Sequence, residues 1–287
     1  MTDTANFEPS PAELDRRRYR SQRKRFSTLI SIASTLVFAL VVWFSLTSTP
    51  GWSRVQSSFF DWDTAVTSFP KVLNGLWLNL RVLVFAAIGV LIFGMLLALM
   101  RTLRNPVFFP LRLFARIYVD FFRGLPLIIV LYLVGFGIPG LRLPGVGRIP
   151  AEVLGVAALI LTYSAYVAEV FRAGIESIHP SQRLAARSLG LSYTQSMRLV
   201  VLPQALRRVA PPLMNDFVSL QKDVGLISIL GAVDAVRAAQ IQVAQAANFT
   251  PYLVSGLLFV ILAIPSIRFA DRITEKFAQR EQVGNAL

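Results

Sequence analysis

The most restrictive feature of the sequence is an uncharged run at residues 26–46, FSTLISIASTLVFALVVWFSL. At about 1.5 Å per residue, a helix of this length matches the roughly 30 Å hydrocarbon core of a bilayer. The basic stretch RRRYRSQRKR stands before it at residues 16–25. A cleaved signal peptide usually has a shorter leader and a shorter apolar region. The run is therefore predicted to be an uncleaved spanning helix.

Five further apolar segments follow, each interrupted by occasional polar residues. They cover residues 75–100, 117–138, 151–175, 206–232 and 251–270. The composition agrees, because 54% of the residues are hydrophobic and only 16% are charged, far from the balance of a soluble domain. The sequence therefore predicts an all-α membrane protein with about six transmembrane helices.

The positions of Lys and Arg predict the direction of these helices, because cytoplasmic loops are enriched in both residues. With six spans, the strongly basic segments fall on one side. They are residues 16–25, the loop with Arg101, Arg104, Arg112 and Arg116, the segment 172–208, and the tail with Arg272, Lys276 and Arg280. The opposite loops carry Arg54, Lys71, Arg142, Arg148 and Arg237, which Asp61, Asp63, Glu152 and Asp234 roughly balance. Both ends of the chain are therefore predicted to be cytoplasmic.

The chain is predicted to divide into five parts. They are a basic cytoplasmic tail at 1–25, an extra N-terminal transmembrane helix at 26–46, an external linker at 47–69, a membrane domain at 70–277 and a cytoplasmic tail at 278–287. The first 25 residues and the linker are polar or rich in turn residues, so no fold is expected for either.

Composition also argues against several kinds of function. The formal charge is +13, but the basic residues are spread between apolar runs, which does not favour nucleic-acid binding. The chain has no cysteine, so disulfides and thiolate chemistry are excluded. The single histidine, His179, precedes Pro180 at a predicted helix start, where a capping role is expected. No catalytic set and no metal site are predicted.

An arginine-rich segment between the fourth and fifth spans is too short and too charged to cross a bilayer. Pro180 suits the first turn of a helix, and Gly190 suits the left-handed residue that closes it. Ser192 and Gln195 fit a capping box that begins a second short helix. Pro203 is expected to end that helix and to open the following span. The segment is thus predicted to form a pair of short cytoplasmic helices.

Both short helices carry apolar residues at helical spacing. These are Leu184, Ala185 and Leu189 on the first helix, and Tyr193, Met197 and Val200 on the second. An apolar face outside the membrane is expected to dock into a groove of a partner protein. The alternative is that both helices rest on anionic lipid headgroups, which the arginines would favour.

Polar side chains inside the predicted spans mark a candidate pathway, because a charge at the bilayer centre costs about 2.5–3.5 kcal/mol on insertion scales. One helix face carries Tyr163, Tyr166 and Glu169; the next span carries Asn215, Ser219 and Lys222, with Asp216 and Asp223 on a neighbouring stripe. The alternative is that Glu169 with Arg172, and Lys222 with Asp223, are ion pairs that lock helices together.

Prolines and glycines predict where the spans bend. Pro211 and Pro212 are expected to break the hydrogen-bond ladder near the start of the fifth span, and Gly225 is expected to loosen it again. Gly124 and Pro126, next to Arg123, indicate a bend where an amphipathic stretch turns into the third span.

The arginine-rich segment resembles the coupling loop of the membrane subunits of ABC importers, whose pattern is Glu-Ala-Ala, three residues, Gly, and Leu-Pro about a dozen residues later. Ala185, Ala186, Gly190, Leu202 and Pro203 keep that spacing. Permeases of the polar amino acid importer group resemble the chain more closely. The matching stretches are GLWLNL (75–80), YVDFFRGLPLIIVLYL (118–133), AYVAEVFRAGIESI (165–178), GLSYTQSMRLVVLPQALRRVAPPLMN (190–215) and SLQKDVGLISILG (219–231). The resemblance covers roughly residues 73–277.

The chain departs from this pattern in three places. Leu184 replaces the usual acidic residue, Ala173 stands where a second glycine is frequent, and Val224-Gly225 occupies a place where Thr-Ser is common. The carboxylate that would normally pair with the ATPase is therefore missing. This departure fits a heterodimer whose other permease keeps the acid.

The resemblance implies that residues 70–277, with coupling helices at about 180–202, form the permease domain of an ATP-driven, binding-protein-dependent importer of a polar amino acid in the bacterial inner membrane. The implied partners are two copies of an ABC ATPase, a second permease that is identical or paralogous, an external solute-binding protein, and membrane lipid. The sequence has no Gly-x-x-x-x-Gly-Lys-Ser/Thr motif, so ATP and Mg would be bound by the ATPase. This chain is expected to bind no cofactor and to be no enzyme.

Two sets of candidate residues follow, the first from the resemblance and the second from the polar positions inside the predicted spans. The ATPase-coupling residues are Leu184, Ala185, Ala186, Gly190, Leu191, Tyr193, Met197 and Pro203; the substrate-path residues are Tyr166, Glu169, Asn215, Ser219, Lys222 and Asp223. An ion-coupled secondary amino acid transporter is the alternative function, and it would need no external helix pair.

Overall fold

A computed structural model of the chain describes residues 10–103, 105–145 and 149–285. Contacts divide the chain into two compact units, Met1–Ser57 and Ser58–Leu287, and each is described by itself. Arg104, Arg148 and the outermost residues of both predicted tails lie outside the described residues. The described residues are nearly all helical and include no β-strand, which confirms the all-α prediction.

The first unit consists mainly of one long helix, α1 (Pro11–Thr47), which contains the predicted span at 26–46. The expectation that residues 1–25 have no fold is wrong from Pro11 onward. Ser10 caps the helix by accepting a hydrogen bond from the Glu13 N–H (3.4 Å). A proline in the first turn and an i,i+4 ion pair between Glu13 and Arg17 (3.1 Å) also stabilise the start of α1. The polar composition of residues 1–25 did not indicate this helix.

The predicted linker at 47–69 is also largely helical, so the expectation of an unstructured linker is wrong. Helix α2 (Trp52–Phe59) lies within it, and α3 (Trp62–Thr102) begins inside it. Asp61 caps α3, since its carboxylate accepts hydrogen bonds from the N–H groups of Asp63 (3.0 Å) and Thr64 (3.4 Å). The Asp61 N–H donates to Thr250 Oγ1 (3.1 Å), which ties this turn to a distant part of the chain.

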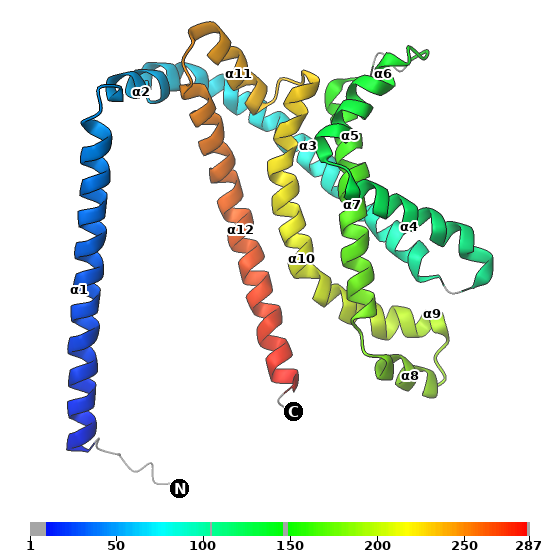
Figure 1. The fold of residues 1–287 in the computed structure, drawn as a ribbon. Helices are drawn as coiled ribbons and strands as arrows, with labels where there is room; N and C mark the ends of the chain where they lie inside the picture. Colours follow the sequence, from blue (N-terminus) through cyan, green and yellow to red (C-terminus); the bar gives the residue numbers. More distant parts are fainter. Residues whose placement is uncertain (1–9, 104, 146–148, 286–287) are drawn as a thin grey trace. The chain divides into compact units, whose positions relative to one another are not determined.

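The second unit contains the remaining helices, and their order can be followed in Figure 1. After α3 come α4 (Phe109–Gly124), α5 (Leu127–Tyr132), α6 (Ile138–Gly140), α7 (Ala151–Glu176), α8 (Pro180–Ser188), α9 (Tyr193–Ser196), α10 (Leu202–Asp223), α11 (Ala235–Ala246) and α12 (Thr250–Asn285). Tighter 3₁₀ turns lie at Pro106–Phe108 and Val224–Leu230, and wider π turns at Leu133–Gly137 and Met197–Val201.

The described helices offer four to six candidate membrane spans. Four are long and apolar enough to cross a bilayer alone, and two bent pairs raise the number to 6 if each pair is one span. In the first pair, Pro106–Gly124 and Leu127–Gly140 meet at 106°, so residues 117–138 do not form the single straight span that the apolar run predicts. The bend falls at Leu125 and Pro126, where the sequence predicted it.

The fifth predicted span, 206–232, also differs from a single α-helix. Helix α10 runs through Pro211 and Pro212 without interruption, so the expected break there is wrong. The α-helical pattern instead changes at Val224 into a 3₁₀ turn, next to Gly225, where loosening was expected. Helix α11 follows after a 50° bend and had no counterpart among the predicted elements.

Helix α7 is the centre of packing in the second unit, because it contacts α3, α4 and α10. Its buried residues Leu159, Tyr163 and Val167 join the largest apolar core. Gly94 on α3 makes the close approach possible, since a Cβ at this position would lie 2.7 Å from Val167 Cγ1. The helix that carries Tyr166 and Glu169 is therefore held firmly between its neighbours.

A fully buried polar network joins α3 to α11. The Asn79 amide donates to the Val224 carbonyl (3.2 Å) and to Asp234 Oδ2 (2.9 Å), and its oxygen accepts from the Ala235 N–H (3.0 Å). Asp234 in turn caps α11 by accepting from the Arg237 N–H (2.8 Å). The sequence treated Asp234 as a loop charge, which is wrong, because its side chain is completely buried.

Candidate functional site

The first short helix of the arginine-rich segment has the ends that the sequence predicted. His179 Nδ1 accepts a hydrogen bond from the Ser181 N–H (3.3 Å) at the start of α8. At the other end Gly190 has a φ of +82°, its N–H donates to the Arg187 carbonyl (2.9 Å), and the Leu191 N–H donates to the Ala186 carbonyl (3.2 Å). These two bonds form the glycine-closed helix end in which the last carbonyls are satisfied.

The second short helix begins with the predicted capping box. The Gln195 N–H donates to Ser192 Oγ (3.3 Å), and the Ser192 N–H donates to Gln195 Oε1 (2.9 Å). The prediction that Pro203 ends this helix is wrong. A π turn at Met197–Val201 follows α9 directly and leads into α10, whose first turn contains the proline.

The π turn explains how the chain stays helical through Pro203. In a regular α-helix the proline ring would clash with the carbonyl four residues earlier, and its missing N–H would leave a gap in the ladder. Here the Leu202 N–H donates to the Met197 carbonyl, one residue farther back than in an α-helix, so the turn is wider. As a result α9 and α10 form one continuous, bent helical segment.

The helix pair separates its apolar side chains into an inner and an outer set. Ala186 is only 3% exposed, and Met197 packs against the small core around Ile178 and Val201. Leu184 and Leu189, by contrast, are 64% and 83% exposed. Ala185 and Tyr193 also face outward, and so does Leu199 in the turn after α9, which was not among the predicted residues. The predicted coupling residues therefore do not form one surface.

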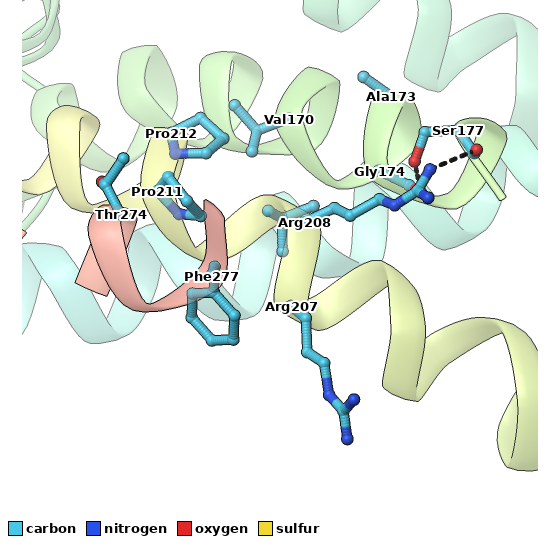
Figure 2. A pocket seen from close by; sticks show the side chains of 11 residues that line it. Val170, Ala173, Gly174, Ser177, Arg207, Arg208, Pro211, Pro212, Thr274 and Phe277 are labelled. Atoms are coloured by element: carbon cyan, nitrogen blue, oxygen red, sulfur yellow. Dashed lines mark hydrogen bonds between the residues drawn. The ribbon is translucent and has the colours of Figure 1, made fainter. Parts of the chain in front are cut away.

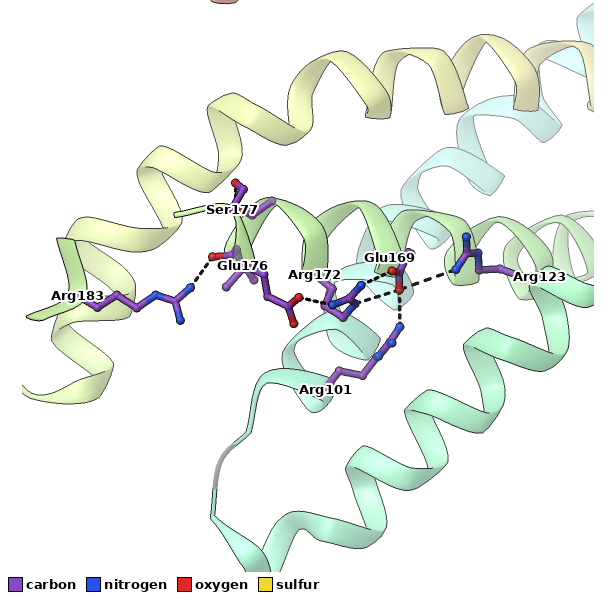
Figure 3. A network of polar contacts seen from close by, with 9 residues as sticks. Arg101, Arg123, Glu169, Arg172, Glu176, Ser177 and Arg183 are labelled. Atoms are coloured by element: carbon purple, nitrogen blue, oxygen red, sulfur yellow. Dashed lines mark hydrogen bonds and ion pairs between the residues drawn. The ribbon is translucent and has the colours of Figure 1, made fainter. Parts of the chain in front are cut away.

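Arginines fasten the helix pair to the end of α7. Arg183 Nη2 donates to the Ile175 carbonyl (2.5 Å), as Figure 3 shows, and Arg208 Nη1 donates to the Ser177 carbonyl (2.6 Å), as Figure 2 shows. Both cations therefore meet carbonyls at the carboxyl end of a helix, where the backbone dipole favours positive charge. At least two of the arginines in this segment, Arg183 and Arg208, therefore have a structural role.

A cavity of about 740 Å³ opens beside Arg208, between α7, α10 and α12 (Figure 2). Its lining residues are Val170, Ala173, Gly174, Ser177, Arg207, Arg208, Val209, Pro211, Pro212, Thr274 and Phe277. The two arginines of α10 give this cavity its positive charge. None of the residues of α8 and α9 and none of the predicted substrate-path residues lines it.

Glu169 is the centre of an ionic cluster (Figure 3). Its carboxylate contacts Arg101 Nη1 of α3 (2.7 Å), Arg172 Nε one turn along α7 (3.1 Å) and, more distantly, Arg123 Nη1 of α4 (3.9 Å). Arg172 also pairs with Glu176. The sequence suggested two structural ion pairs as the alternative to a substrate pathway. The first of them, Glu169 with Arg172, is present.

The second suggested pair, Lys222 with Asp223, does not appear among the ion pairs of the described residues. Asp223 instead accepts a hydrogen bond from Tyr163 Oη (2.7 Å) on α7, whereas Lys222 is exposed. Asn215 is exposed as well. The face with Asn215 and Lys222 thus points away from α7, and the neighbouring stripe with the two aspartates faces it.

A second, smaller cavity lies between α7, α10 and the break that separates α4 from α5. It has a volume of about 240 Å³ and is lined by Leu125, Pro126, Leu127, Thr162, Tyr163, Tyr166, Asp216, Ser219 and Asp223. We call it the aspartate cavity. Of the six predicted path residues it brings together Tyr166, Ser219 and Asp223, and it leaves out Glu169, Asn215 and Lys222.

Asp216 and Thr162 also line the aspartate cavity, although neither is among the predicted path residues. Asp216 stood on the stripe next to the chosen one, three residues before Ser219 and seven before Asp223, so its spacing on α10 was the available signal. Thr162 gave no signal, because its place in the cavity wall depends on the distant bend at Pro126. The described residues contain no group of three or more His, Cys, Asp or Glu side chains that could hold a metal ion.

The structure has the features of a membrane transport component. It combines long apolar helices, a charged pair of short helices after α7, and a polar cavity between α7 and α10. The chain belongs to the family described as binding-protein-dependent transport system inner membrane component, whose profile matches residues 90–281. It is therefore the membrane permease subunit of a binding-protein-dependent importer, as the resemblance predicted. This result favours an importer over the ion-coupled secondary transporter.

Shorter relatives, each covered over most of its own length, support the assignment. The chain is 33% identical over 215 residues to the probable glutamine ABC transporter permease protein GlnM of Bacillus subtilis (strain 168), covering 73% of this chain and 95% of the relative. It is 33% identical over 205 residues to the arginine transport system permease protein ArtQ of the same organism, covering 71% and 91%. It is 36% identical over 184 residues to the glutamate/aspartate import permease protein GltK of Escherichia coli O157:H7, covering 63% and 81%.

Two solved structures show the same fold. A crystal structure of an amino acid ABC transporter with histidines is 31% identical, has a TM-score of 0.68, and covers 75% of this chain and 98% of its own. An inward-facing MetNI methionine ABC transporter is 21% identical with a TM-score of 0.57, covers 72% and 96%, and supports the fold alone.

Proposed function

We propose that this chain is a permease subunit for a polar amino acid in the bacterial inner membrane. The relatives named for glutamine, arginine and glutamate/aspartate support an amino acid as the substrate, and so does the solved amino acid transporter. The permease domain would extend over 70–277, preceded by the extra span at 26–46. Both ends of the chain would be cytoplasmic, as the distribution of Lys and Arg indicates.

The helix pair α8 and α9 would be the contact with a separate ATPase. Its outward side carries Leu184, Leu189 and Tyr193 in a segment too short to cross a membrane. An exposed apolar helix face of this size fits a groove on a partner protein. Ala185 would share that contact, whereas Ala186, Gly190, Leu191, Met197 and Pro203 would hold the pair in shape.

One structural observation supports this proposal most strongly, namely the unbroken path from the helix pair to the aspartate cavity. The π turn joins α9 to α10, so a displacement of α9 acts on α10 without an intervening loop. Helix α10 carries Asp216, Ser219 and Asp223 in the cavity wall. ATP-driven closure of the ATPases would thus move one wall of the pathway against α7, which produces alternating access.

The assembly would contain two permeases, two ATPase subunits and an external binding protein. ATP and Mg would be bound by the ATPase subunits, and this chain would hydrolyse nothing. Leu184 supplies no carboxylate to the ATPase. A paralogous second permease that keeps this acid would therefore complete a heterodimer.

Co-purification tests the proposal. The tagged chain is expressed with the products of its neighbouring genes, extracted in detergent, and assayed for a retained ATP-binding subunit. Leu189→Asp places a charge on the outward face of α8 and is expected to release the ATPase. Leu141→Asp is the matched control, since Leu141 is 65% exposed in the turn after α6, on the predicted external side. Failure of the unmodified chain to retain an ATPase, or equal retention by both variants, would contradict the proposed coupling.

A further inference from the structure

A small, positively charged pocket lies between α8, α9 and the π turn that follows them. It has a volume of about 230 Å³ and is lined by Pro180, Arg183, Leu184, Arg187, Tyr193, Ser196, Met197 and Val201. We call it the arginine pocket. Residues 177–208 contain no Asp or Glu, and neither of its arginines forms an ion pair within the described part of the chain. The pocket therefore favours an anionic group from outside the chain.

Two hydrogen-bond donors of the lining residues are buried without a partner among the described residues. Ser196 is only 4% exposed, and its Oγ has no partner. Arg183 Nε is buried and unpaired as well. A serine inside a helix can donate back to the carbonyl four residues earlier, but Ser196 does not. Buried polar atoms are nearly always hydrogen-bonded, so these two donors are placed to receive an acceptor.

The Arg183 guanidinium is held in position from its other end. Its Nη2 donates to the Ile175 carbonyl (2.5 Å), as Figure 3 shows, and the acidic residue that follows Ile175, Glu176, is engaged by Arg172. The ordered guanidinium therefore has no internal carboxylate to pair with. An incoming carboxylate meets a donor whose orientation is already fixed, which lowers the entropic cost of the contact.

On the basis of the proposed contact with the ATPase, we propose that the arginine pocket receives the carboxylate of an Asp or Glu side chain of the ATP-binding subunit. Leu184 and Tyr193, which are 64% and 46% exposed, belong both to the pocket wall and to the outward apolar face of the helix pair. The volume suits one side chain, since pockets for drug-sized ligands measure roughly 300–1,000 Å³. Arg183 and Ser196 donate to the carboxylate, and the exposed Arg187 adds positive charge.

Retention of the ATPase by purified, tagged complexes is the first test. Arg187→Glu places a carboxylate one turn from Arg183, where it fills the pocket from within and competes with the partner's acid. Arg198→Glu is the matched control, because it makes the same change of charge at an exposed residue that does not line the pocket. We expect Arg187→Glu to retain roughly tenfold less ATPase than Arg198→Glu, as the loss of a buried interfacial charge pair implies.

The second variant pair separates binding from folding. Ser196→Ala removes a hydroxyl that has no hydrogen bond within the described residues, so the fold loses nothing and its thermal stability should be unchanged or higher. We nevertheless expect Ser196→Ala to retain severalfold less ATPase than the unmodified chain. Thr194→Ala removes an exposed hydroxyl outside the pocket and is expected to behave as the unmodified chain does.

A zero-length carbodiimide cross-link identifies the occupant directly, because it joins an amine to a carboxylate in contact with it. In Arg187→Lys we expect an amide bond between the introduced amine and an Asp or Glu of the ATP-binding subunit, located by mass spectrometry, and no such product in Arg198→Lys. Equal retention by the two Glu variants, unchanged retention by Ser196→Ala, or a loss of bound phosphatidylglycerol in place of ATPase from Arg187→Glu overturns the carboxylate site. If the unmodified chain still retains its ATPase in those cases, the proposed function stands.

Discussion

Gly190 offers the sharpest test of how the helix pair is built. Its φ of +82° lies in the left-handed region, and a Cβ at this position would meet no atom within 4 Å. A substitution therefore acts through the backbone alone. An ordinary L-residue costs roughly 1–2 kcal/mol in this conformation, which shifts the equilibrium from the closed to the open turn by about five- to thirtyfold. Asparagine tolerates the conformation better than other residues with a side chain.

Proline is the extreme member of this series. Its ring holds φ near −65°, and it lacks the N–H that Gly190 donates to the Arg187 carbonyl (2.9 Å). Gly190→Pro is therefore expected to open the end of α8 completely. The assay is ATP hydrolysis by the reconstituted complex, with and without the loaded binding protein, together with the amount of chain inserted in the membrane.

We expect Gly190→Pro to abolish the stimulated hydrolysis at unchanged insertion, Gly190→Val to reduce it strongly, and Gly190→Asn to stay near the unmodified level. Normal stimulation in Gly190→Pro would refute the reasoning. Equal behaviour of the Val and Asn variants would also refute it, since the left-handed conformation would then play no part in the response.

Two further substitutions probe the packing. Ala186→Phe inserts a large ring at a site that is 3% exposed, and overpacking of this kind typically costs about 1–3 kcal/mol. Stimulated ATP hydrolysis should therefore fall while membrane insertion persists. Unchanged stimulation would show that the packing of α8 at Ala186 is not required. Asn79→Leu leaves Asp234 Oδ2, the Val224 carbonyl and the Ala235 N–H without their hydrogen-bond partner, at a cost of about 1–3 kcal/mol for each unsatisfied group. The purified complex should therefore denature at a clearly lower temperature. An unchanged midpoint of thermal denaturation would contradict the network.

Features with a local cause could be predicted from the sequence. The left-handed Gly190, the Ser192–Gln195 capping box and the bend at Pro126 each depend on residues within a few positions, and the structure confirms all three. Pro203 was misjudged for a local reason as well. A proline that ends an α-helix can remain in a helix when a wider turn precedes it, and the residues Met197–Val201 gave no sign of that turn.

Features that depend on distant residues could not be predicted. Arg101 reaches Glu169 across 68 positions of sequence, so the spacing within α7 indicated only the nearer partner, Arg172. The burial of Asp234 follows from Asn79, which lies 155 positions away. The aspartate cavity was partly accessible to prediction, because helical spacing located the polar residues of α7 and α10. It did not tell which stripe of α10 faces α7.

Single-cysteine cross-linking tests most directly whether the helix pair meets the ATPase. The chain has no native cysteine, so Leu189→Cys introduces the only thiol, at a side chain that is 83% exposed. With a short bifunctional reagent in native membranes, we predict a covalent product with the ATP-binding subunit whose yield changes when ATP is added, and no such product from Leu141→Cys. Labelling of Leu189→Cys by a lipid-embedded reagent, or by a membrane-impermeant reagent from outside intact cells, would contradict the proposal.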